Sequence, residues 1–178
     1  VSGLIRSDSN TSRLKRQIVL RKGDLRDLNS LNKAFEGVDL VVNCAAALPH
    51  HKLPDKDYWD INVKGVKNVV TACKSKGVKR LVHISTVGVY GPTLTNGASE
   101  KSAVNLTDVY TKTKYEGDKI VMQNRSRLPS VIIRPTIAYG PFDIRPAFLR
   151  LFRMTKMGIN IVIGTGDNYL HTVYIDNL

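Results

Sequence analysis

The chain has 178 residues, 42% of them hydrophobic and 24% charged, which is the composition of a globular protein about one domain in size. Its formal net charge of +12, from 27 basic and 15 acidic residues, is typical of proteins that bind nucleic acids. The basic residues are spread over all the expected helices and no zinc finger or RNA-recognition motif accompanies them, so nucleic-acid binding is disfavoured and an anionic small ligand is favoured.

Short apolar runs alternate along the chain with segments of helical periodicity, which indicates parallel strands joined by helical crossovers. The expected strands are residues 2–6, 17–21, 39–44, 80–84, 130–134 and 160–163. The expected helices are residues 27–35, 60–75, 109–124 and 147–157. Asp27 has a capping position, and Gly37, Gly77 and Gly158 follow expected helices. We predict an α/β fold with a doubly wound parallel sheet of the Rossmann type.

No run of 18 apolar residues is present, so the sequence shows no membrane span, and the first ten residues lack the features of a secretory signal. Cys44 and Cys73 have neither a metal-binding nor a disulfide spacing, and the four histidines show no metal-ligand pattern. These observations favour reduced thiols, no bound metal and a cytoplasmic location.

Tyr110 and Lys114 stand four residues apart in the expected helix 109–124, and Thr86 lies at the end of an expected strand. Positions i and i+4 project from one face, so the Lys114 ammonium can lie beside the Tyr110 phenol and favour its ionised form. Thr86 would place a hydroxyl beside the same substrate oxygen. The three residues predict a site that interconverts an alcohol and a ketone with a nicotinamide as hydride carrier. The competing interpretation is an exposed tyrosine and a solvated lysine.

Seven segments, in this order, resemble the extended short-chain dehydrogenase/reductase superfamily, which includes nucleotide-sugar epimerases, dehydratases, steroid dehydrogenases and flavonoid reductases. They cover essentially the whole chain. A lone Tyr-x-x-x-Lys motif would be weak support, whereas seven segments in the right order are specific. The segments are 23–25 (GDL), 41–46 (VVNCAA), 62–65 (NVKG), 83–91 (HISTVGVYG), 110–114 (YTKTK), 133–135 (IRP) with 139–141 (YGP), and 173–177 (VYIDN).

The Gly-rich turn that follows the first strand in this superfamily is not found in the sequence. The strand at residues 2–6 resembles the second strand of the superfamily, and the first strand is central in the order 3-2-1-4-5-6. We therefore expect two strands without a neighbour that links them to the rest, and an excerpt of a longer protein. Residues 1–140 would form a truncated dinucleotide-binding domain, and residues 141–178 part of a substrate-binding region with a late strand.

The resemblance implies a set of cofactor-binding residues. Arg6 stands where NAD-specific members have an acidic residue, which favours the extra phosphate of NADP, with NAD as the alternative and Ser7 or Arg13 as helpers. Asp24 and Leu25 resemble the pair beside the adenine ring. The implied cofactor residues are Arg6, Asp24, Leu25, Asn43, Ala45, Ala46, Lys114, Pro135 and Thr136. Each also has a plain structural interpretation, such as a turn, tight packing or a strand-ending proline.

For the reaction, the resemblance implies that Tyr110 passes the proton, that Thr86 orients the substrate oxygen, and that Lys114 also binds the nicotinamide ribose. Ser85 is the adjacent alternative to Thr86, and Tyr90 packs beside the site or touches the substrate. The resemblance also implies a small-molecule substrate and a homodimer.

Two departures from the superfamily pattern bear on the substrate. Val87 and Gly88 stand where dehydratases carry an acidic pair, which disfavours dehydration. Leu170 stands where nucleotide-sugar enzymes tend to have a diphosphate-binding arginine, which favours a less charged substrate. We therefore predict an NADP-preferring oxidoreductase of a small, largely uncharged alcohol or ketone. A nucleotide-sugar epimerase, with Arg145 or Arg150 replacing the arginine, and a non-catalytic dinucleotide sensor are the alternatives.

Overall fold

The computed structural model describes residues 1–12, 14, 17–92, 97–143, 146–160, 162, 165–167 and 170–178. These residues form two compact units, Val1–Arg134 and Pro135–Leu178. The division falls earlier in the chain than the boundary expected after residue 140. None of the helices in the described part of the chain combines the length and the hydropathy needed to cross a bilayer.

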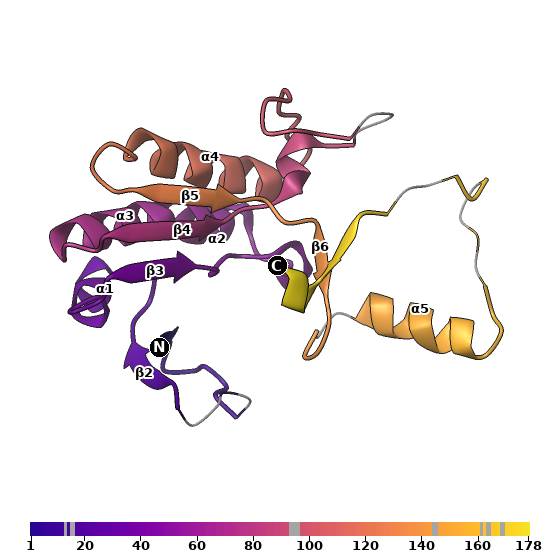
Figure 1. Ribbon diagram of the computed structural model, residues 1–178, viewed down its shortest axis with the longest axis horizontal. Coiled ribbons are helices and arrows are strands. Elements are labelled where there is room, and N and C mark those ends of the chain that lie inside the picture. Colours follow the sequence, from indigo (N-terminus) through magenta and orange to yellow (C-terminus); the bar gives the residue numbers. More distant parts are fainter. Residues whose placement is uncertain are drawn as a thin grey trace. The chain divides into compact units, whose positions relative to one another are not determined.

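The strands of the first unit pair in parallel, in two sheets (Figure 1). One sheet joins β1 (Ser2–Ile5) to β2 (Val19–Lys22), and the other has the order β3 (Leu40–Asn43), β4 (Arg80–Ile84), β5 (Ser130–Ile133). These five strands confirm five of the six expected ones. Among the described residues, the β1–β2 pair has no strand linking it to β3–β5, as the superfamily strand order led us to expect. The sixth expected strand, 160–163, falls partly outside the described residues.

The helices of the first unit confirm the periodicity of the sequence. Asp27 caps the first of them, because its side chain accepts a hydrogen bond from Asn29 N at 2.9 Å. The glycines that follow two of the helices, Gly37 and Gly77, have φ of +67° each, a conformation that suits glycine at a helix end. The helices are α1 (Leu28–Ala34), α2 (Asp55–Trp59), α3 (Gly65–Ser75) and α4 (Val109–Gln123), with 3-10 segments η1 (Pro49–His51) and η3 (Val87–Tyr90) and a π-helical segment η2 (Asp60–Lys64).

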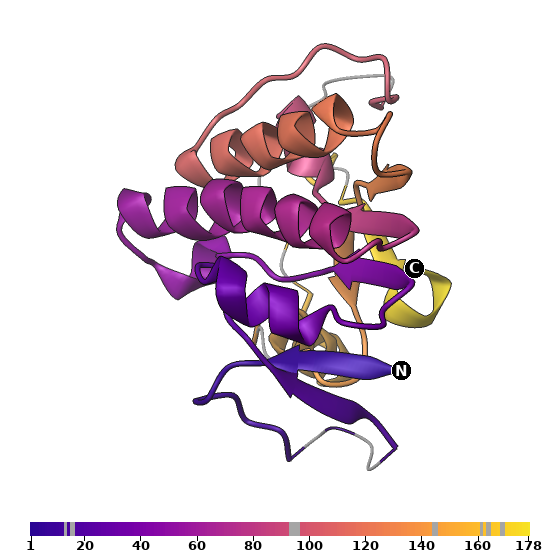
Figure 2. The same ribbon diagram turned by 90° about the vertical axis from the view of Figure 1, so that its left-hand side faces the viewer.

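The core of this unit lies between the β3–β4–β5 sheet and the helices. Figure 2 shows α1, α3 and α4 side by side on one face of this sheet. Leu31 and Leu81 are fully buried there, whereas Leu40 and Val42, which alternate with the buried side chains of β3, are 51% and 53% exposed. Within the described part of this unit the helices cover one face, and the double winding of the sheet stays an expectation.

The helical run before the core helix α3 begins at Asp55, five residues earlier than the sequence indicated, and passes through the wider turn η2. Asn62 in that turn accepts from Ala47 N at 2.8 Å and donates to Ala47 O and to Thr113 Oγ1, each at 3.1 Å. Helix α4 lies close to the same turn, because a Cβ on Gly117 would stand 2.7 Å from Asn62 O. The turn therefore fixes α4 against the chain that follows β3.

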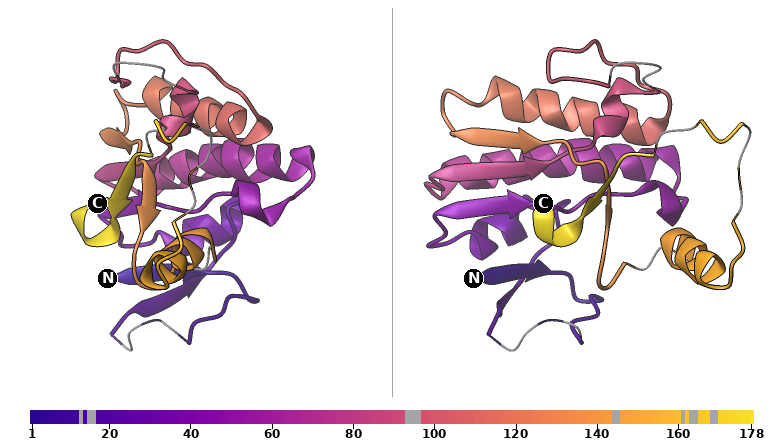
Figure 3. Two further views of the ribbon diagram at one scale, coloured as in Figure 1. Left: turned by 90° about the vertical axis from the view of Figure 1, so that its right-hand side faces the viewer. Right: turned by 45° about the vertical axis from the view of Figure 1, so that its right-hand side comes forward.

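The second unit contains a pair of short parallel strands and one helix. Strand β6 (Ile137–Tyr139) pairs with β7 (Thr172–Tyr174), which lies beside it in both views of Figure 3. Neither was among the strands expected from the sequence. Helix α5 (Pro146–Lys156) confirms the expected helix at 147–157, and Gly158 follows it with φ of +76°. The Tyr139 ring packs against Phe148 and Tyr174, with centroids 5.7 and 5.6 Å apart. The chain ends in the 3-10 segment η4 (Ile175–Asn177).

Candidate active site

The expected catalytic residues come from the end of β4 and the first two turns of α4. Thr86 directly precedes η3, where its Oγ1 accepts from Gly88 N at 3.1 Å. Asp108 caps α4 by accepting from Thr111 N at 2.7 Å, so the helix begins at Val109. Tyr110 therefore stands in the first turn of the helix, and its phenol lies close enough to the Thr86 hydroxyl for that group to act on the phenol pKa. The structure thus brings together the two hydroxyl groups that the sequence placed at one substrate oxygen.

The pKa of Tyr110 differs from the expectation. Burial raises the pKa of the phenol, the hydrogen bond with Thr86 lowers it, and the negative charge of Asp108 raises it again, with a net increase. The prediction that Lys114 lowers the pKa of Tyr110 is therefore wrong for the protein chain taken alone. Helical spacing places Lys114 on the same face as Tyr110, but the Lys114 ammonium donates to a backbone carbonyl. Burial is the stronger influence on this phenol.

Lys114 is a buried ammonium, with only 3% of the residue exposed. Its Nζ donates to Ile84 O at 2.6 Å, which ties α4 to the end of β4. Burial lowers the pKa of Lys114 to about 8, and the neighbouring carboxylate of Asp118 opposes that shift. An ammonium carries three N–H donors, and within the described part of the chain one of them is used. The other two suit the hydroxyl oxygens of a sugar.

A second charged pair lies next to these residues. Asp118, one helical turn after Lys114 and fully buried, accepts at Oδ2 from Ser85 Oγ at 2.9 Å and from Arg134 Nε and Nη2 at 3.0 and 2.9 Å. Arg134 also donates from Nη1 to Tyr90 Oη at 2.6 Å, and its guanidinium carbon lies 5.3 Å from the centre of the Tyr90 ring. Tyr90 is 7% exposed, so its hydroxyl belongs to a buried network. Substrate contact by Tyr90 stays a prediction.

The sequence interpretation missed Asp118 and Arg134 as members of the site. A signal was present, because Asp118 follows Lys114 by the same four residues that separate Lys114 from Tyr110. Arg134 lies within segment 133–135, one of the seven that resemble the superfamily, but a role was predicted only for Pro135 of that segment. Only the fold shows that the two charges meet.

The expected cofactor residues after β3 lie at the carboxyl end of the sheet. Ala45 is exposed and Ala46 half-buried, which leaves room for a ligand to approach the backbone there. Asn43 is 6% exposed, and its side-chain amide lies 3.2 Å from His83 Nδ1 while its oxygen accepts from Ala45 N at 3.3 Å. Asn43 thus supports the loop that carries the two alanines.

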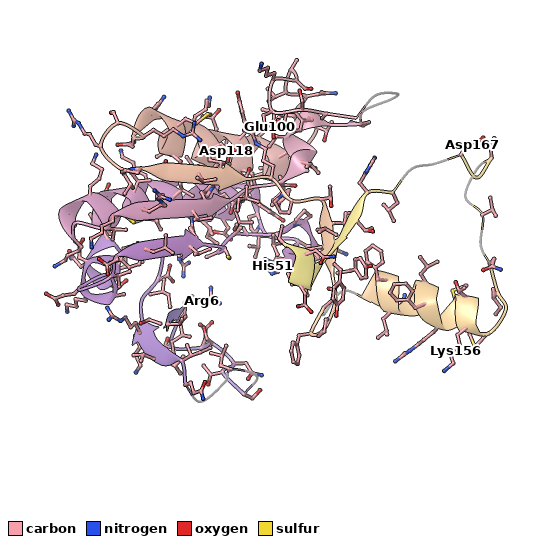
Figure 4. The ribbon with its side chains drawn as sticks, viewed as in Figure 1. Arg6, His51, Glu100, Asp118, Lys156 and Asp167 are labelled. Atoms are coloured by element: carbon pink, nitrogen blue, oxygen red, sulfur yellow. The ribbon has the colours of Figure 1, made fainter. Side chains whose placement is uncertain are left out.

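The residues expected at the adenosine end of the cofactor have partners within the chain. The Asp24 carboxylate accepts from Arg26 Nη2 at 2.6 Å, and this hydrogen bond lowers the pKa of Asp24. Leu25 packs its side chain in the core. Arg6, labelled in Figure 4, is exposed and pairs with Asp8 at 3.2 Å. The arginine of this exposed pair is free to exchange Asp8 for a phosphate.

The remaining expected residues are placed as follows. Pro135 and Thr136 lie between β5 and β6, at the start of the second unit, and each is half-buried. Leu170 is 61% exposed. The helper Arg13 and the alternative arginine Arg145 lie outside the described residues.

The residues present fit a bound nicotinamide dinucleotide. Small side chains follow β3, and Lys114, whose Nζ donates to Ile84 O at the end of β4, offers two further N–H donors. In parallel α/β sheets, ligands bind outside the carboxyl ends of the strands, which is where these groups gather.

Comparison with known proteins decides the family. The model of the 3-beta hydroxysteroid dehydrogenase/isomerase family matches residues 4–178. The chain belongs to this family. The family is part of the extended short-chain dehydrogenase/reductase superfamily, so the resemblance found in the sequence is confirmed. It is a family of enzymes for which NAD(P) is the typical cofactor.

Individual relatives include dehydrogenases and epimerases. The chain is 33% identical to 3beta-hydroxysteroid-dehydrogenase/decarboxylase isoform 2 of Arabidopsis thaliana, over 87% of this chain and 28% of that protein. It is 31% identical to N-acetyl-alpha-D-glucosaminyl-diphospho-ditrans,octacis-undecaprenol 4-epimerase of Escherichia coli O157:H7, over 88% of this chain and 48% of that protein. The crystal structure of UDP-glucuronic acid 4-epimerase from Bacillus cereus in complex with NAD matches with a TM-score of 0.74 and 28% identity, over 92% of this chain and 54% of that one. The chain thus spans about half the length of these relatives, or less.

Proposed function

We propose that the protein containing this chain is an NAD(P)-dependent oxidoreductase that interconverts a secondary alcohol and a ketone on a small, largely uncharged molecule. The observation that carries the proposal is the convergence of Thr86, Tyr110 and Lys114 at the carboxyl end of β4. Family membership supports the reaction class. The name of the Arabidopsis relative, a 3beta-hydroxysteroid-dehydrogenase/decarboxylase, supports a secondary alcohol as the reacting group.

Each residue has a definite task in this proposal. A bound nicotinamide supplies or accepts the hydride. Tyr110 passes the proton to or from the substrate oxygen, and the Thr86 hydroxyl, which lies near the phenol, holds that oxygen in place. Lys114 donates two hydrogen bonds to the ribose of the cofactor while its third reaches Ile84 O.

The test is the stoichiometry of cofactor use in the full-length protein. A reductase releases its cofactor, so each mole of ketone reduced should consume one mole of NADPH or NADH, followed by nicotinamide absorbance. Turnover of an alcohol or ketone without net cofactor consumption would contradict the proposal.

A nucleotide-sugar epimerase is the second candidate, and the 31% identity to the Escherichia coli 4-epimerase favours it. The same three residues would oxidise one carbon and reduce it again with a retained cofactor. Purified protein that already carries tightly bound nicotinamide, and that turns over a nucleotide sugar without added cofactor, would establish this alternative.

Arg6 supports a preference for NADP. Its guanidinium can exchange the exposed partner Asp8 for the 2′-phosphate of NADP, with bidentate hydrogen bonds. We expect Arg6→Gln to weaken NADPH binding about tenfold, the effect of losing one charge-assisted contact, and to leave NADH binding unchanged. Titration of both cofactors into the full-length protein measures the ratio. The exposed Arg125 provides the control, because Arg125→Gln removes the same charge elsewhere. Equal weakening of both cofactors by Arg6→Gln would assign NADP preference to another residue.

A further inference from the structure

The buried carboxylate of Asp118 connects helix α4 to the residues that follow two strands. Ser85 follows β4 and Arg134 follows β5. Asp118 itself, labelled in Figure 4, stands on α4. Because Oδ2 accepts three hydrogen bonds, the group has the bonding pattern of an ionised carboxylate. Arg134 supplies the opposite charge, without which a buried carboxylate would be costly.

The other oxygen of this carboxylate faces His83. The Nε2 atom of His83 lies 3.6 Å from Asp118 Oδ1, beyond hydrogen-bond distance, and among the described residues neither atom has a hydrogen-bond partner. On the opposite side of the ring, Nδ1 lies 3.2 Å from the Asn43 amide, which can donate to it. This leaves the proton of a neutral imidazole on Nε2, pointing at Asp118. Burial lowers the pKa of His83 to about 3, so the contact is polar and not an ion pair at neutral pH.

Two consequences follow for the catalytic residues. His83 and Ser85 flank Ile84, whose carbonyl accepts a hydrogen bond from Lys114. Because Asp118 contacts both His83 and Ser85, it fixes the strand segment to which Lys114 is hydrogen-bonded. The next residue is Thr86. In addition, the negative charge of Asp118 lies one helical turn from Lys114, where it favours the protonated ammonium against the effect of burial.

We propose that Asp118 is a positioning residue: with Arg134 as its counter-charge, it locks helix α4 onto the ends of β4 and β5 so that Thr86 and Tyr110 meet, and it keeps Lys114 charged. This role rests on the proposed alcohol–ketone reaction. A purely structural ion pair would fix α4 on the strands but would not keep Lys114 charged. The pH profile of kcat distinguishes these two roles.

The charged and titratable groups around Lys114 come from four elements. Asp118 and Tyr110 stand on the same helix, His83 on β4 and Cys44 after β3, and Arg134 after β5 is paired with Asp118. His83 is neutral at neutral pH, and burial raises the pKa of the Cys44 thiol, which therefore stays uncharged there too. The raised pKa of Tyr110 keeps that phenol protonated as well, so among these described groups Asp118 is the anion that acts on Lys114 in this pH range.

The test is Asp118→Asn in the full-length protein, which keeps the shape and removes the charge. We expect kcat to fall about 10- to 100-fold, as for a small misplacement of reacting groups. We also expect the alkaline limb of the kcat profile to move to lower pH, because Lys114 then loses its proton more readily. Glu116→Gln is the matched control, since it removes a partly exposed carboxylate of the same helix, paired with Lys119, and should change neither quantity.

The double variant Asp118→Asn with Arg134→Gln separates charge from structure. In the single variant the Arg134 guanidinium loses its charged partner, whereas the double variant removes both charges together. The double variant therefore serves as the test if the single variant does not fold. An alkaline limb that stays at lower pH in the double variant supports the action on Lys114. A limb at the wild-type position, in either variant, overturns the proposal. If the wild-type protein shows no nicotinamide-dependent turnover at all, the proposed function fails instead.

Discussion

Replacing Tyr110 by phenylalanine in the full-length protein is expected to lower turnover by roughly 10²–10⁴-fold, the range that a positioned acid or base contributes. The ring keeps its place in the first turn of α4, and only the phenol oxygen near Thr86 is lost. Cofactor affinity should stay nearly unchanged, because the ribose contacts are assigned to Lys114. Steady-state kinetics and a cofactor titration of the same preparation measure both quantities.

Tyr115 provides the control for this substitution. It stands on the same helix and is half-buried. Its ring centre lies 5.6 Å from Lys119 Nζ. Tyr115→Phe should leave turnover within a factor of about two. Full activity of Tyr110→Phe would remove Tyr110 from the mechanism, and a loss of cofactor binding equal to the loss of turnover would assign it a binding role.

The raised pKa of Tyr110 has a consequence for the direction of proton transfer. A phenol whose pKa lies above its usual range stays protonated at neutral pH, so the charges of the chain itself prepare Tyr110 to donate a proton. Donation to the substrate oxygen is the step that accompanies ketone reduction. The positive charge of an oxidised nicotinamide would act in the opposite sense, which would favour proton acceptance during alcohol oxidation.

Local signals in the sequence were sufficient for most of the elements. Val109–Gln123 became a helix where periodicity indicated 109–124, and Asp27 caps Leu28–Ala34, because spacing and capping are properties of neighbouring residues. The strands β6 and β7 were missed for the opposite reason. Each has three residues, and they pair across more than thirty positions, so their formation depends on contacts that no local pattern reveals.

The candidate site divides in the same way. Tyr110 and Lys114 were chosen by their spacing on one helix, which the structure confirms as a helix. The electrostatics were not predictable from spacing, because the pKa of Tyr110 depends on burial and the position of the Lys114 ammonium depends on Ile84 O. The partnership of Asp118 with Arg134 joins residues sixteen positions apart through the packing of α4 on β5, so only the fold could place them together.

Lys114→Met is expected to have opposite effects on activity and on stability. Cofactor affinity should fall about 10- to 100-fold, because two hydrogen bonds from a charged group are lost, and turnover should fall with it. The folded chain, by contrast, should become more stable at neutral pH. Burial lowers the pKa of Lys114 from 10.5 to about 8, so keeping the side chain protonated costs about 3 kcal/mol of folding free energy.

The loss of the hydrogen bond to Ile84 O offsets part of this gain. The attraction between Lys114 and Asp118 is already included in the pKa of about 8. We therefore expect a net increase of about 1 kcal/mol in the free energy of unfolding at about pH 7. The penalty is fully present below about pH 8, where Lys114 is charged in both states. It disappears as the pH rises from about 8 towards 10.5, because the folded protein then binds fewer protons than the unfolded chain. The advantage of the variant should vanish over the same range.

Urea unfolding of the wild-type and variant proteins at about pH 7 and about pH 10 measures this change, and cofactor titration of the same samples measures affinity. Lys112→Met is the control, since Lys112 is an exposed residue of the same helix, and its replacement should change stability by less than about 0.5 kcal/mol at both pH values. A destabilised Lys114→Met at neutral pH would show that the lysine serves the fold. A stabilised variant that has lost cofactor affinity would show that the buried charge is maintained for function at the expense of stability.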